Sequence, residues 1–250
     1  MVKTELALDG RAAIVRLARP SALNALSGPL LNQLDAALDR LADLPELRVF
    51  VLTGSEACFC VGADLKGPLT DVGARVDRMH RLVERLIQVR AISIAAVEGW
   101  ALGGGLELAM ACTFRVAAPG ARLGLPEIRL GVIPSYGGTQ LAPRIIGAAR
   151  ALELLCLGEP VDAEQAERIG LVNWVAPEAG GALALALDRA AVLAERSAAA
   201  LGAVVQAVRA GQMLSLRDAL AVEADLGARL IANGAVDPAG AFRSRKTRSR

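Results

Sequence analysis

The segment AISIAAVEGWALGGGLELAMAC, residues 91–112, carries the strongest fold signal in the chain. Its first nine residues form an apolar run closed by Gly99, which predicts a buried strand. Three consecutive glycines, Gly103 to Gly105, then open an apolar stretch that we expect to be helical as far as Cys112. A strand, a glycine-rich turn and a helix in direct succession favour an α/β fold with a largely buried sheet.

Strand and helix signals also occur on both sides of this segment. Residues 2–8 and 12–18 are β-compatible runs around Asp9-Gly10, which predicts a hairpin. The chain beyond Pro177 is rich in Ala, Leu and Val with helical spacing. We therefore expect a core over residues 1–180 and a helical C-terminal region over residues 181–250 that serves subunit packing. Further strands are predicted at residues 47–54, 113–118, 121–125 and 171–176, and helices from the N-cap Ser27 onward and over residues 72–90.

Composition narrows the class of protein. The chain has 250 residues of which 54% are hydrophobic, enough for a sizeable core, so disorder is excluded for most of its length. With 28 Lys and Arg against 26 Asp and Glu, the net charge of +2 argues against nucleic acid or a membrane surface as a general partner. The beginning, MVKTELALDG, resembles no secretory signal, and no apolar run is long enough to span a bilayer.

Cysteine and histidine usage points away from disulfide and metal chemistry. Four cysteines are too few for a disulfide scaffold in a chain of this length, so we expect reduced thiols and a cytoplasmic location. The single histidine, His80, lies in a predicted helix with nothing resembling a nucleophile elbow around it. Cys58 and Cys60 lack a second ligand pair, so no metal site is expected.

The glycines and two glutamates suggest proton transfer. Without Cβ atoms, the backbone at Gly103 to Gly105 can approach a ligand closely and direct N–H groups at a carbonyl oxygen that gains negative charge. Glu107 follows Gly104 by three residues, which places its carboxylate about one turn into the same helix. Close packing of helix on sheet would explain the three glycines equally well.

A second loop supplies similar groups. FCVGADLK, residues 59–66, follows the neighbouring predicted strand and offers another N–H at Ala63. Glu127 lies in the segment LGLPEIRLGVIPSYGGTQ, residues 123–140, where Pro126 and several glycines predict a loop. A loop salt bridge between Glu127 and Arg129 is the alternative to a catalytic role.

Taken together, these motifs resemble the crotonase superfamily, the enoyl-CoA hydratase/isomerase family. The resemblance covers roughly the first 180 residues, and its motifs occur in the same order and at the same spacing. It implies a wound β-β-α superhelix with a C-terminal helical region, assembled as a homotrimer or as a hexamer of two trimers. The motifs are RPSALNAL (19–26), VLTGSEACFCVGADL (51–65), IAAVEGWALGGGLELAMAC (94–112), GLPEIRLGVIPSYGGTQLAPRIIG (124–147) and AERIGLVNWVAP (166–177).

The resemblance also implies an activity. It assigns the oxyanion-hole amides to Ala63 and Gly104, activation of water to Glu107, and supply of the α-proton to Glu127. The implied reaction is syn hydration of a 2-enoyl-CoA to a 3-hydroxyacyl-CoA, with coenzyme A as part of the substrate and no metal or redox cofactor. Double-bond isomerisation, thioester hydrolysis, decarboxylation and noncatalytic binding of an acyl-CoA remain alternatives on the same scaffold.

Coenzyme A contacts are implied in two segments, and several residues depart from the family pattern. Ala22 and Leu23 fall on the nucleotide side, and the segment Ala63, Asp64, Leu65 and Lys66 falls near the pantetheine. Lys66 would meet a phosphate or be simply solvated, and the same alternatives hold for the basic tail RSRKTRSR, residues 243–250.

Ser135 replaces a common glycine and Tyr136 a small residue, so we expect altered water geometry and an altered acyl pocket. The other departures are Ser21, Leu141 and Glu98.

Overall fold

The main sheet of the protein has six strands, in the order β1-β2-β3-β5-β7-β10. The computed structural model describes residues 1–66 and 72–232. In this sheet β1 and β2 form the predicted antiparallel hairpin, and the other neighbouring strands are parallel. The strands are β1 (Val2–Ala7), β2 (Ala12–Leu17), β3 (Val49–Thr53), β5 (Ile92–Val97), β7 (Phe114–Ala117) and β10 (Trp174–Val175).

A second sheet of four strands has the order β4-β6-β8-β9. Its first three strands are parallel, and β9 is antiparallel to β8. Strands β4, β6 and β9 were not predicted, because each is only two or three residues long and lies in no longer β-compatible run. The strands are β4 (Cys58–Cys60), β6 (Trp100–Leu102), β8 (Arg122–Gly124) and β9 (Val161–Asp162).

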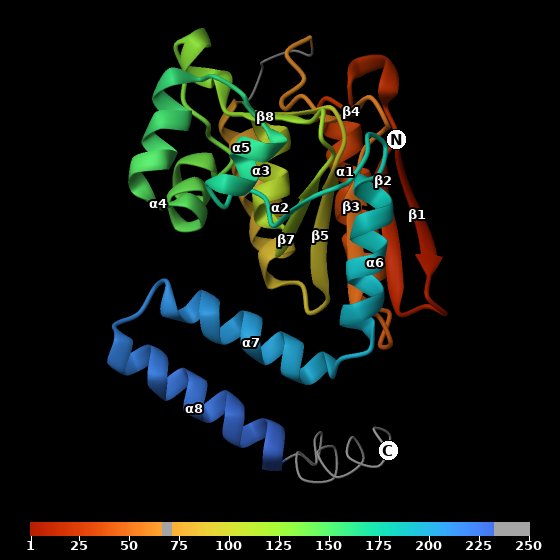
Figure 1. The fold of residues 1–250 in the computed structure, drawn as a ribbon, viewed down its shortest axis with the longest axis vertical. Helices are drawn as coiled ribbons and strands as arrows, with labels where there is room; N and C mark the ends of the chain where they lie inside the picture. Colours follow the sequence, from red (N-terminus) through yellow and green to blue (C-terminus); the bar gives the residue numbers. More distant parts are fainter. Residues whose placement is uncertain (67–71, 233–250) are drawn as a thin grey trace. The chain divides into compact units, whose positions relative to one another are not determined.

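Successive strand pairs build both sheets together. The pairs β3 and β4, β5 and β6, and β7 and β8 each place their first strand in the main sheet and their second in the other sheet. Helices α2 and α3 lie between these pairs, so the chain winds through repeated β-β-α turns, as predicted (Figure 1). The helices of this part are α1 (Gly28–Ala42), α2 (Val72–Gln88), α3 (Gly104–Ala111), α4 (Gly138–Leu157) and α5 (Ala163–Arg168), with 3-10 turns η1 (Pro20–Ala22) and η2 (Pro126–Leu130).

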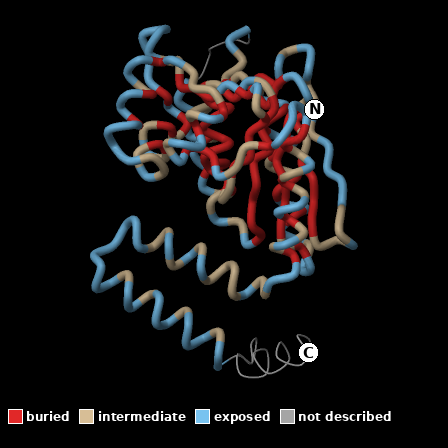
Figure 2. The backbone as a smooth tube through the Cα atoms, in the orientation of Figure 1, coloured by how far each residue is buried: buried red, intermediate tan, exposed pale blue. Residues whose placement is uncertain are grey.

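The central strands β3 and β5 of the main sheet are buried on both faces, which explains their continuous apolar runs, whereas the edge strand β1 is largely exposed (Figure 2). Phe50 and Leu52 of β3 belong to the same core cluster as the leucines of α1. Val49 and Val51 alternate with them and are buried on the other face. Helix α1 begins where predicted, because the Ser27 side chain accepts a hydrogen bond from the amide of Leu30 at 3.4 Å.

Helix α6 (Ala182–Ala194) covers that second face of the sheet. Its four buried residues are alanines at every fourth position, and α6 contacts β2, β3, β5 and β7. The chain divides into compact units at Met1–Ala194 and Glu195–Arg250. The division therefore follows α6 and does not fall after residue 180, because small side chains let α6 pack directly on the sheet.

Glu98, at the end of β5, is hydrogen-bonded to the start of α6. Its carboxylate is buried and accepts hydrogen bonds from the amide of Ala182 at 2.8 Å and from the amide of Gly180 at 3.2 Å. These amides lie at the N-terminal end of α6, where backbone donors have no partner within the helix. This departure from the family pattern is thus a helix-capping residue.

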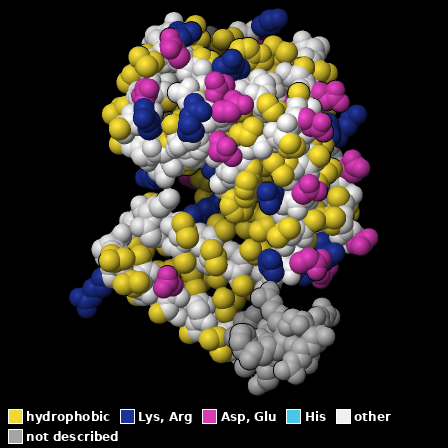
Figure 3. Space-filling model, viewed as in Figure 1, with side chains coloured by type: hydrophobic (Ala, Val, Ile, Leu, Met, Phe, Trp, Pro, Cys, Tyr) yellow, Lys and Arg dark blue, Asp and Glu magenta, His cyan; other side chains and the backbone are white. Residues whose placement is uncertain are grey.

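The second unit contains α7 (Ala198–Gly211) and α8 (Leu216–Ala232), which pack against each other. Neither helix has a buried residue, and hydrophobic side chains are visible on the surface of this pair (Figure 3). Among the described residues, no helix is by itself both long and apolar enough to cross a bilayer, although α6 and α7 reach that length and apolarity when counted together across their break. The basic tail at residues 243–250 lies outside the described residues.

We predict that Glu98→Ala lowers the free energy of unfolding by about 1–3 kcal/mol, because it leaves two amides at the start of α6 without an acceptor. Glu98→Gln keeps an acceptor oxygen and should cost less than Glu98→Ala. Urea denaturation of both variants and the parent protein measures the difference. Equal stability of Glu98→Ala and the parent protein would show that this cap contributes nothing.

Candidate active site

Two loops that are distant in sequence are joined side by side at the ends of η1 and β4. The amide of Leu26 donates to the carbonyl of Gly62 at 2.8 Å, and the amide of Asp64 donates to the carbonyl of Leu26 at 3.4 Å. This bridge aligns Leu26 with Ala63. The two segments in which coenzyme A contacts were predicted therefore form one continuous surface.

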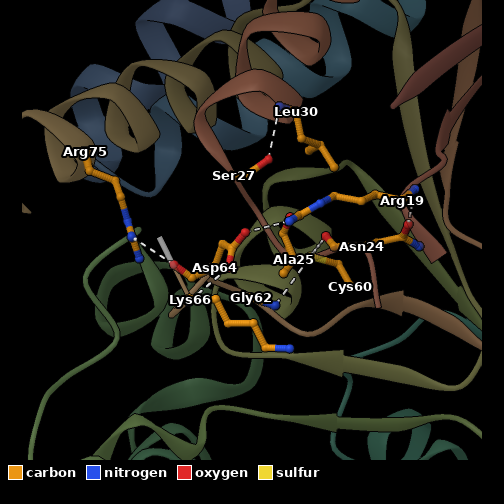
Figure 4. A network of polar contacts seen from close by, with 10 residues as sticks. All are labelled: Arg19, Asn24, Ala25, Ser27, Leu30, Cys60, Gly62, Asp64, Lys66 and Arg75. Atoms are coloured by element: carbon orange, nitrogen blue, oxygen red, sulfur yellow. Dashed lines mark hydrogen bonds and ion pairs between the residues drawn. The ribbon is translucent and has the colours of Figure 1, made fainter. Parts of the chain in front are cut away.

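Buried polar groups hold these loops in place (Figure 4). Asn24 is fully buried and donates from its side-chain amide to the carbonyls of Cys58 and Phe59 at 2.9 and 3.0 Å. Arg19 bonds both the carbonyl of Ala25, at 3.0 Å, and the carboxylate of Asp64, at 2.7 Å. The hydrogen bond from Arg19 lowers the pKa of Asp64, so this ion pair stays charged at neutral pH.

The remaining predicted contact residues lie toward solvent. Ala22 ends η1, and Leu23 follows in the left-handed region with φ +49° and is about half exposed. Leu65 is exposed, and so is Lys66, whose amide donates to the Asp64 carboxylate at 3.1 Å. These residues border the joined loops without forming a closed pocket among themselves.

The turn before α3 lies directly against the Gly62–Ala63 turn. A Cβ atom on Gly62 would lie 2.9 Å from the amide nitrogen of Gly104, so only glycine fits between the two turns. Gly103 has φ +50° and donates its amide to the carbonyl of Gly124 at 2.9 Å. Within residues 1–66 and 72–232, the amides of Ala63 and Gly104 donate to no protein acceptor. Two unpaired N–H groups from adjacent turns are thus available to a ligand.

The third glycine of the motif serves packing. A Cβ atom on Gly105 would lie 2.1 Å from the carbonyl oxygen of Cys60, so the start of α3 rests directly on β4. Close packing therefore explains Gly105, while the binding of a ligand by the amide of Gly104 stays a prediction.

Glu107 is held in the first turn of α3 by two backbone amides. Its carboxylate is almost fully buried, and Oε1 accepts hydrogen bonds from the amides of Tyr136 at 2.8 Å and Gly138 at 2.7 Å. A Cβ atom on Gly138 would lie 2.9 Å from this oxygen, so glycine is required there. The segment from residue 135 to 138 thereby fixes one oxygen of the carboxylate.

Glu127 lies in η2 with its carboxyl group over Gly103. Its Oε1 is 2.7 Å from the position that a Cβ atom on Gly103 would take. Its Oε2 is buried without a hydrogen-bond partner in the described structure. The alternative salt bridge with Arg129 does not form, since Arg129 pairs with Glu159 at 3.5 Å. A buried and unpaired carboxyl oxygen next to Gly104 indicates a place for a ligand.

Burial shifts both carboxyl groups toward their protonated forms. The pKa of Glu107 is raised from 4.5 to about 7, mainly by burial and also by the nearby Glu127, while the amides of Gly138 and Tyr136 act in the opposite direction. Burial likewise raises the pKa of Glu127. The effect of Glu127 on the pKa of Glu107 indicates that the two predicted acids lie near each other. A buried carboxyl group with a pKa near 7 can exchange a proton near neutral pH.

Ser135 and Tyr136 take different positions. Tyr136 is buried, and a Cβ atom on Gly104 would lie 2.7 Å from its ring. Ser135 is exposed, and its carbonyl is 2.8 Å from Nε2 of His80. Tyr136 thus borders the site with its ring, as expected for a residue that alters the acyl pocket, whereas Ser135 faces outward.

Arg75 is a residue of this region that the sequence analysis missed. It donates from Nε to the Tyr136 hydroxyl at 2.5 Å. The available signal was periodicity, because Arg75 precedes the buried Met79, Leu82 and Leu86 by four, seven and eleven residues and so lies on the inward face of α2. A cation on such a face is a candidate for a buried interaction.

The four cysteines are free thiols, as predicted. Burial raises the pKa of Cys58 to about 11 and that of Cys60 to about 12, so both are neutral. In the part of the chain that the structure describes, no three His, Cys, Asp or Glu side chains come together in a way suited to a metal ion. The absence of a metal from the reaction stays a prediction.

Comparison with known proteins identifies the family. The family model for enoyl-CoA hydratase/isomerase matches residues 9–241. The probable enoyl-CoA hydratase of Mycobacterium tuberculosis is 41% identical over 217 residues, which cover 86% of this chain and 84% of that protein. That of Bacillus subtilis is 38% identical over 224 residues, covering 88% and 86%.

Solved structures agree with this result. The crystal structure of enoyl-CoA hydratase from Bacillus anthracis superposes with a TM-score of 0.92 at 33% identity, covering 99% of this chain and 96% of that one. The wound β-β-α core also places two glutamates beside two glycine-bearing turns. From this core and from the similarity to these relatives, we conclude that the protein belongs to the enoyl-CoA hydratase/isomerase family and has the crotonase fold.

Proposed function

We propose that the protein hydrates 2-enoyl-CoA thioesters to 3-hydroxyacyl-CoA thioesters. The observation that carries this proposal is that Glu107 and Glu127 share one buried site beside two unpaired amides. Relatives named as enoyl-CoA hydratases support the same reaction.

The amides of Ala63 and Gly104 would bind the thioester oxygen. Negative charge develops on this oxygen when water adds to Cβ, and donors fixed in a water-poor site stabilise that charge without reorganising. Loss of one such donor typically costs about 3–4 kcal/mol of transition-state stabilisation. The Gly62–Ala63 and Gly103–Gly104 turns are fixed by backbone hydrogen bonds, so both donors are in place before substrate binds.

The two glutamates would move the protons. Oε1 of Glu107 is held by two amides, which leaves its other oxygen to take a proton from water as the water oxygen bonds to Cβ. Glu127 in its protonated form would donate to Cα as the double bond is lost. Exchange of protons with solvent then restores both carboxyl groups.

Coenzyme A would lie along the joined loops. Ala22 and Leu23 would meet its nucleotide part, and residues 63–66, including Asp64, Leu65 and Lys66, would meet the pantetheine. The exposed ammonium group of Lys66 is free to approach a phosphate, and no metal or redox cofactor has a role in the proposed steps. Four free cysteines favour a cytoplasmic location.

We also infer that the helical pair α7–α8 packs against other copies of the chain. A unit of two helices without a buried residue has no core of its own. Exposed hydrophobic residues on the pair include Val204, Val208, Met213, Leu216, Leu220 and Ile231. A homotrimer or a hexamer of two trimers, as members of the family form, would cover them.

We predict that the protein consumes crotonyl-CoA and longer 2-enoyl-CoAs with loss of the enoyl absorbance and a mass gain of one water. Glu107→Gln and Glu127→Gln should each lower kcat by at least about 100-fold while substrate binding changes little. Glu84→Gln, on the exposed side of α2, is the matched control and should retain full activity.

Mass spectrometry of the products separates the alternatives. An unchanged mass, free coenzyme A or loss of carbon dioxide would assign isomerisation, thioester hydrolysis or decarboxylation. Binding without turnover, unaffected by Glu107→Gln, would identify a noncatalytic acyl-CoA-binding protein.

We predict that kcat/KM for hydration falls as the pH drops below about 7, because Glu107 must be ionised to accept the proton of water. Initial rates at low substrate concentration between pH 5 and 9 measure this acid limb. A rate that stays constant from pH 5 to 8 would contradict the assignment of Glu107 as the base.

The same pKa predicts how stability depends on pH. Glu107 in the folded protein holds its proton to about pH 7, whereas in the unfolded chain it ionises near pH 4.5, so its contribution to stability declines as the pH rises through this window. Glu107→Gln should therefore stabilise the protein more at pH 8 than at pH 5, with a difference on the order of 3 kcal/mol. Thermal unfolding at the two pH values checks this; the same change in Tm at both would exclude the raised pKa.

A further inference from the structure

A groove runs from the proposed site along the facing sides of α1 and α2. Its volume is about 450 Å³. Leu26, Pro29 and Leu31 provide apolar lining, and Arg75 and Arg78 provide two cations. Leu26 also lies 3.1 Å from the position that a Cβ atom on Gly104 would take. The groove therefore begins where the acyl chain of a bound thioester would leave the oxyanion site.

Arg75 is the cation of this groove that forms no ion pair with a carboxylate of residues 1–66 or 72–232. It donates from Nε to the hydroxyl of Tyr136 at 2.5 Å. It donates from Nη1 to the backbone carbonyl of Asp64 at 3.4 Å (Figure 4). Its guanidinium carbon also lies 5.9 Å from the centre of the Tyr136 ring. All of these partners are neutral groups, so the positive charge of Arg75 is not balanced by them.

The neighbouring carboxylates are already engaged elsewhere. Asp64 pairs with Arg19 at 2.7 Å. Arg78 approaches the carboxylate of Asp35 at 4.0 Å. Over residues 1–66 and 72–232, no ion pair involves Arg75.

An arginine in this state is suited to binding an anion. Its side chain is half-buried, so water compensates its charge only in part, and a carboxylate would supply the missing partner. A guanidinium group matches a carboxylate through two parallel hydrogen bonds. Nε bonds Tyr136 and one N–H of Nη1 bonds the carbonyl of Asp64, so the second N–H of Nη1 and those of Nη2 are left to bind a carboxylate.

The location of Arg75 restricts which part of a ligand it can meet. The ring of Tyr136 extends from Gly104, where the thioester oxygen would bind, to Arg75 at its hydroxyl end. A group on Arg75 would therefore be separated from the thioester by about the length of one aromatic ring. That separation suits the far end of a short acyl chain.

We propose that the acyl pocket accepts a short acyl group that ends in a carboxylate, and that Arg75 binds this carboxylate. The inference rests on the proposed function, since it specifies the substrate class of the same site. Tyr136 acts as a positioning residue, because its hydroxyl orients Arg75 and its ring narrows the pocket beside Gly104.

Binding measurements test the proposal without requiring turnover. Glutaryl-CoA and pentanoyl-CoA have acyl groups of five carbons that differ in the terminal carboxylate, and neither carries a double bond to hydrate. Isothermal titration of the purified full chain should give a Kd at least about tenfold lower for glutaryl-CoA, as expected for a charge-assisted hydrogen bond. Equal affinity, or tighter binding of pentanoyl-CoA, would overturn the proposal.

Substitutions then locate the preference. Arg75→Met should reduce the ratio of the two affinities at least about tenfold, while Arg81→Met, the same change at an exposed position of α2, should leave it unchanged. Arg75→Lys retains the charge but loses the paired donors, so it should give an intermediate ratio and serves if Arg75→Met does not fold. If the ratio of the two affinities is unchanged in both Arg75 variants, Arg75 does not bind the carboxylate.

Two further measurements complete the experiment: the binding of free coenzyme A, and the hydration of two unsaturated thioesters, glutaconyl-CoA and 2-pentenoyl-CoA. If Arg75→Met weakens free coenzyme A as much as glutaryl-CoA, the anion on Arg75 is a phosphate of the coenzyme and the proposal is wrong. Glutaconyl-CoA should be hydrated with a higher kcat/KM than 2-pentenoyl-CoA. Selective binding of glutaryl-CoA without hydration of any enoyl-CoA would uphold the carboxylate site and contradict the proposed function alone.

Discussion

The direct contact of backbone with backbone between the start of α3 and the β4 loop determines the geometry of the site. Gly105 rests on the carbonyl of Cys60, and Gly62 lies against the amide of Gly104, at separations that no Cβ atom would permit. This contact brings two turns of the wound chain together, and the amides of Ala63 and Gly104 in these turns have no acceptor within residues 1–66 and 72–232. It also fixes the direction in which α3 presents Glu107. A larger side chain at either glycine would separate the groups that the proposed reaction needs together.

Around this contact, the protein places two carboxyl groups where water compensates their charge poorly. Glu107 is held by the amides of Tyr136 and Gly138, and one oxygen of Glu127 has no hydrogen-bond partner among the described residues. Burial of an ionisable carboxyl group destabilises the folded state, and such groups are found mainly at functional sites. The proposed proton transfers use the same feature, because carboxyl groups that are protonated near neutral pH can both donate and accept. The buried polar side chains of Asn24 and Glu98, by contrast, form hydrogen bonds with backbone groups and so make the fold more rigid.

Much of this arrangement was predictable from the sequence, since it depends on local patterns. The buried strands at β3 and β5, the hairpin and the capped helix after Ser27 are confirmed. Glu127 also lies close enough to Glu107 to raise its pKa, while the roles of the two glutamates stay predictions. The short strands β4, β6 and β9 were not predicted, because pairing within a sheet and not their own residues makes them strands. The boundary after α6 depends on alanines that pack on a sheet formed far earlier in the chain. The contacts of Arg75 and Glu98 likewise join residues that are 61 and 84 positions apart, which no local pattern reveals.

In the proposed mechanism, two main-chain donors and two acids surround one thioester group. A crystal structure of the protein with acetoacetyl-CoA, an unreactive analogue of the product class, would show whether they do. We expect the thioester oxygen at about 2.7–3.1 Å from the amide nitrogens of both Ala63 and Gly104. We also expect the carboxyl groups of Glu107 and Glu127 beside Cβ and Cα of the acyl chain. A thioester oxygen bound elsewhere, or an acyl chain that contacts neither glutamate, would rule out this mechanism.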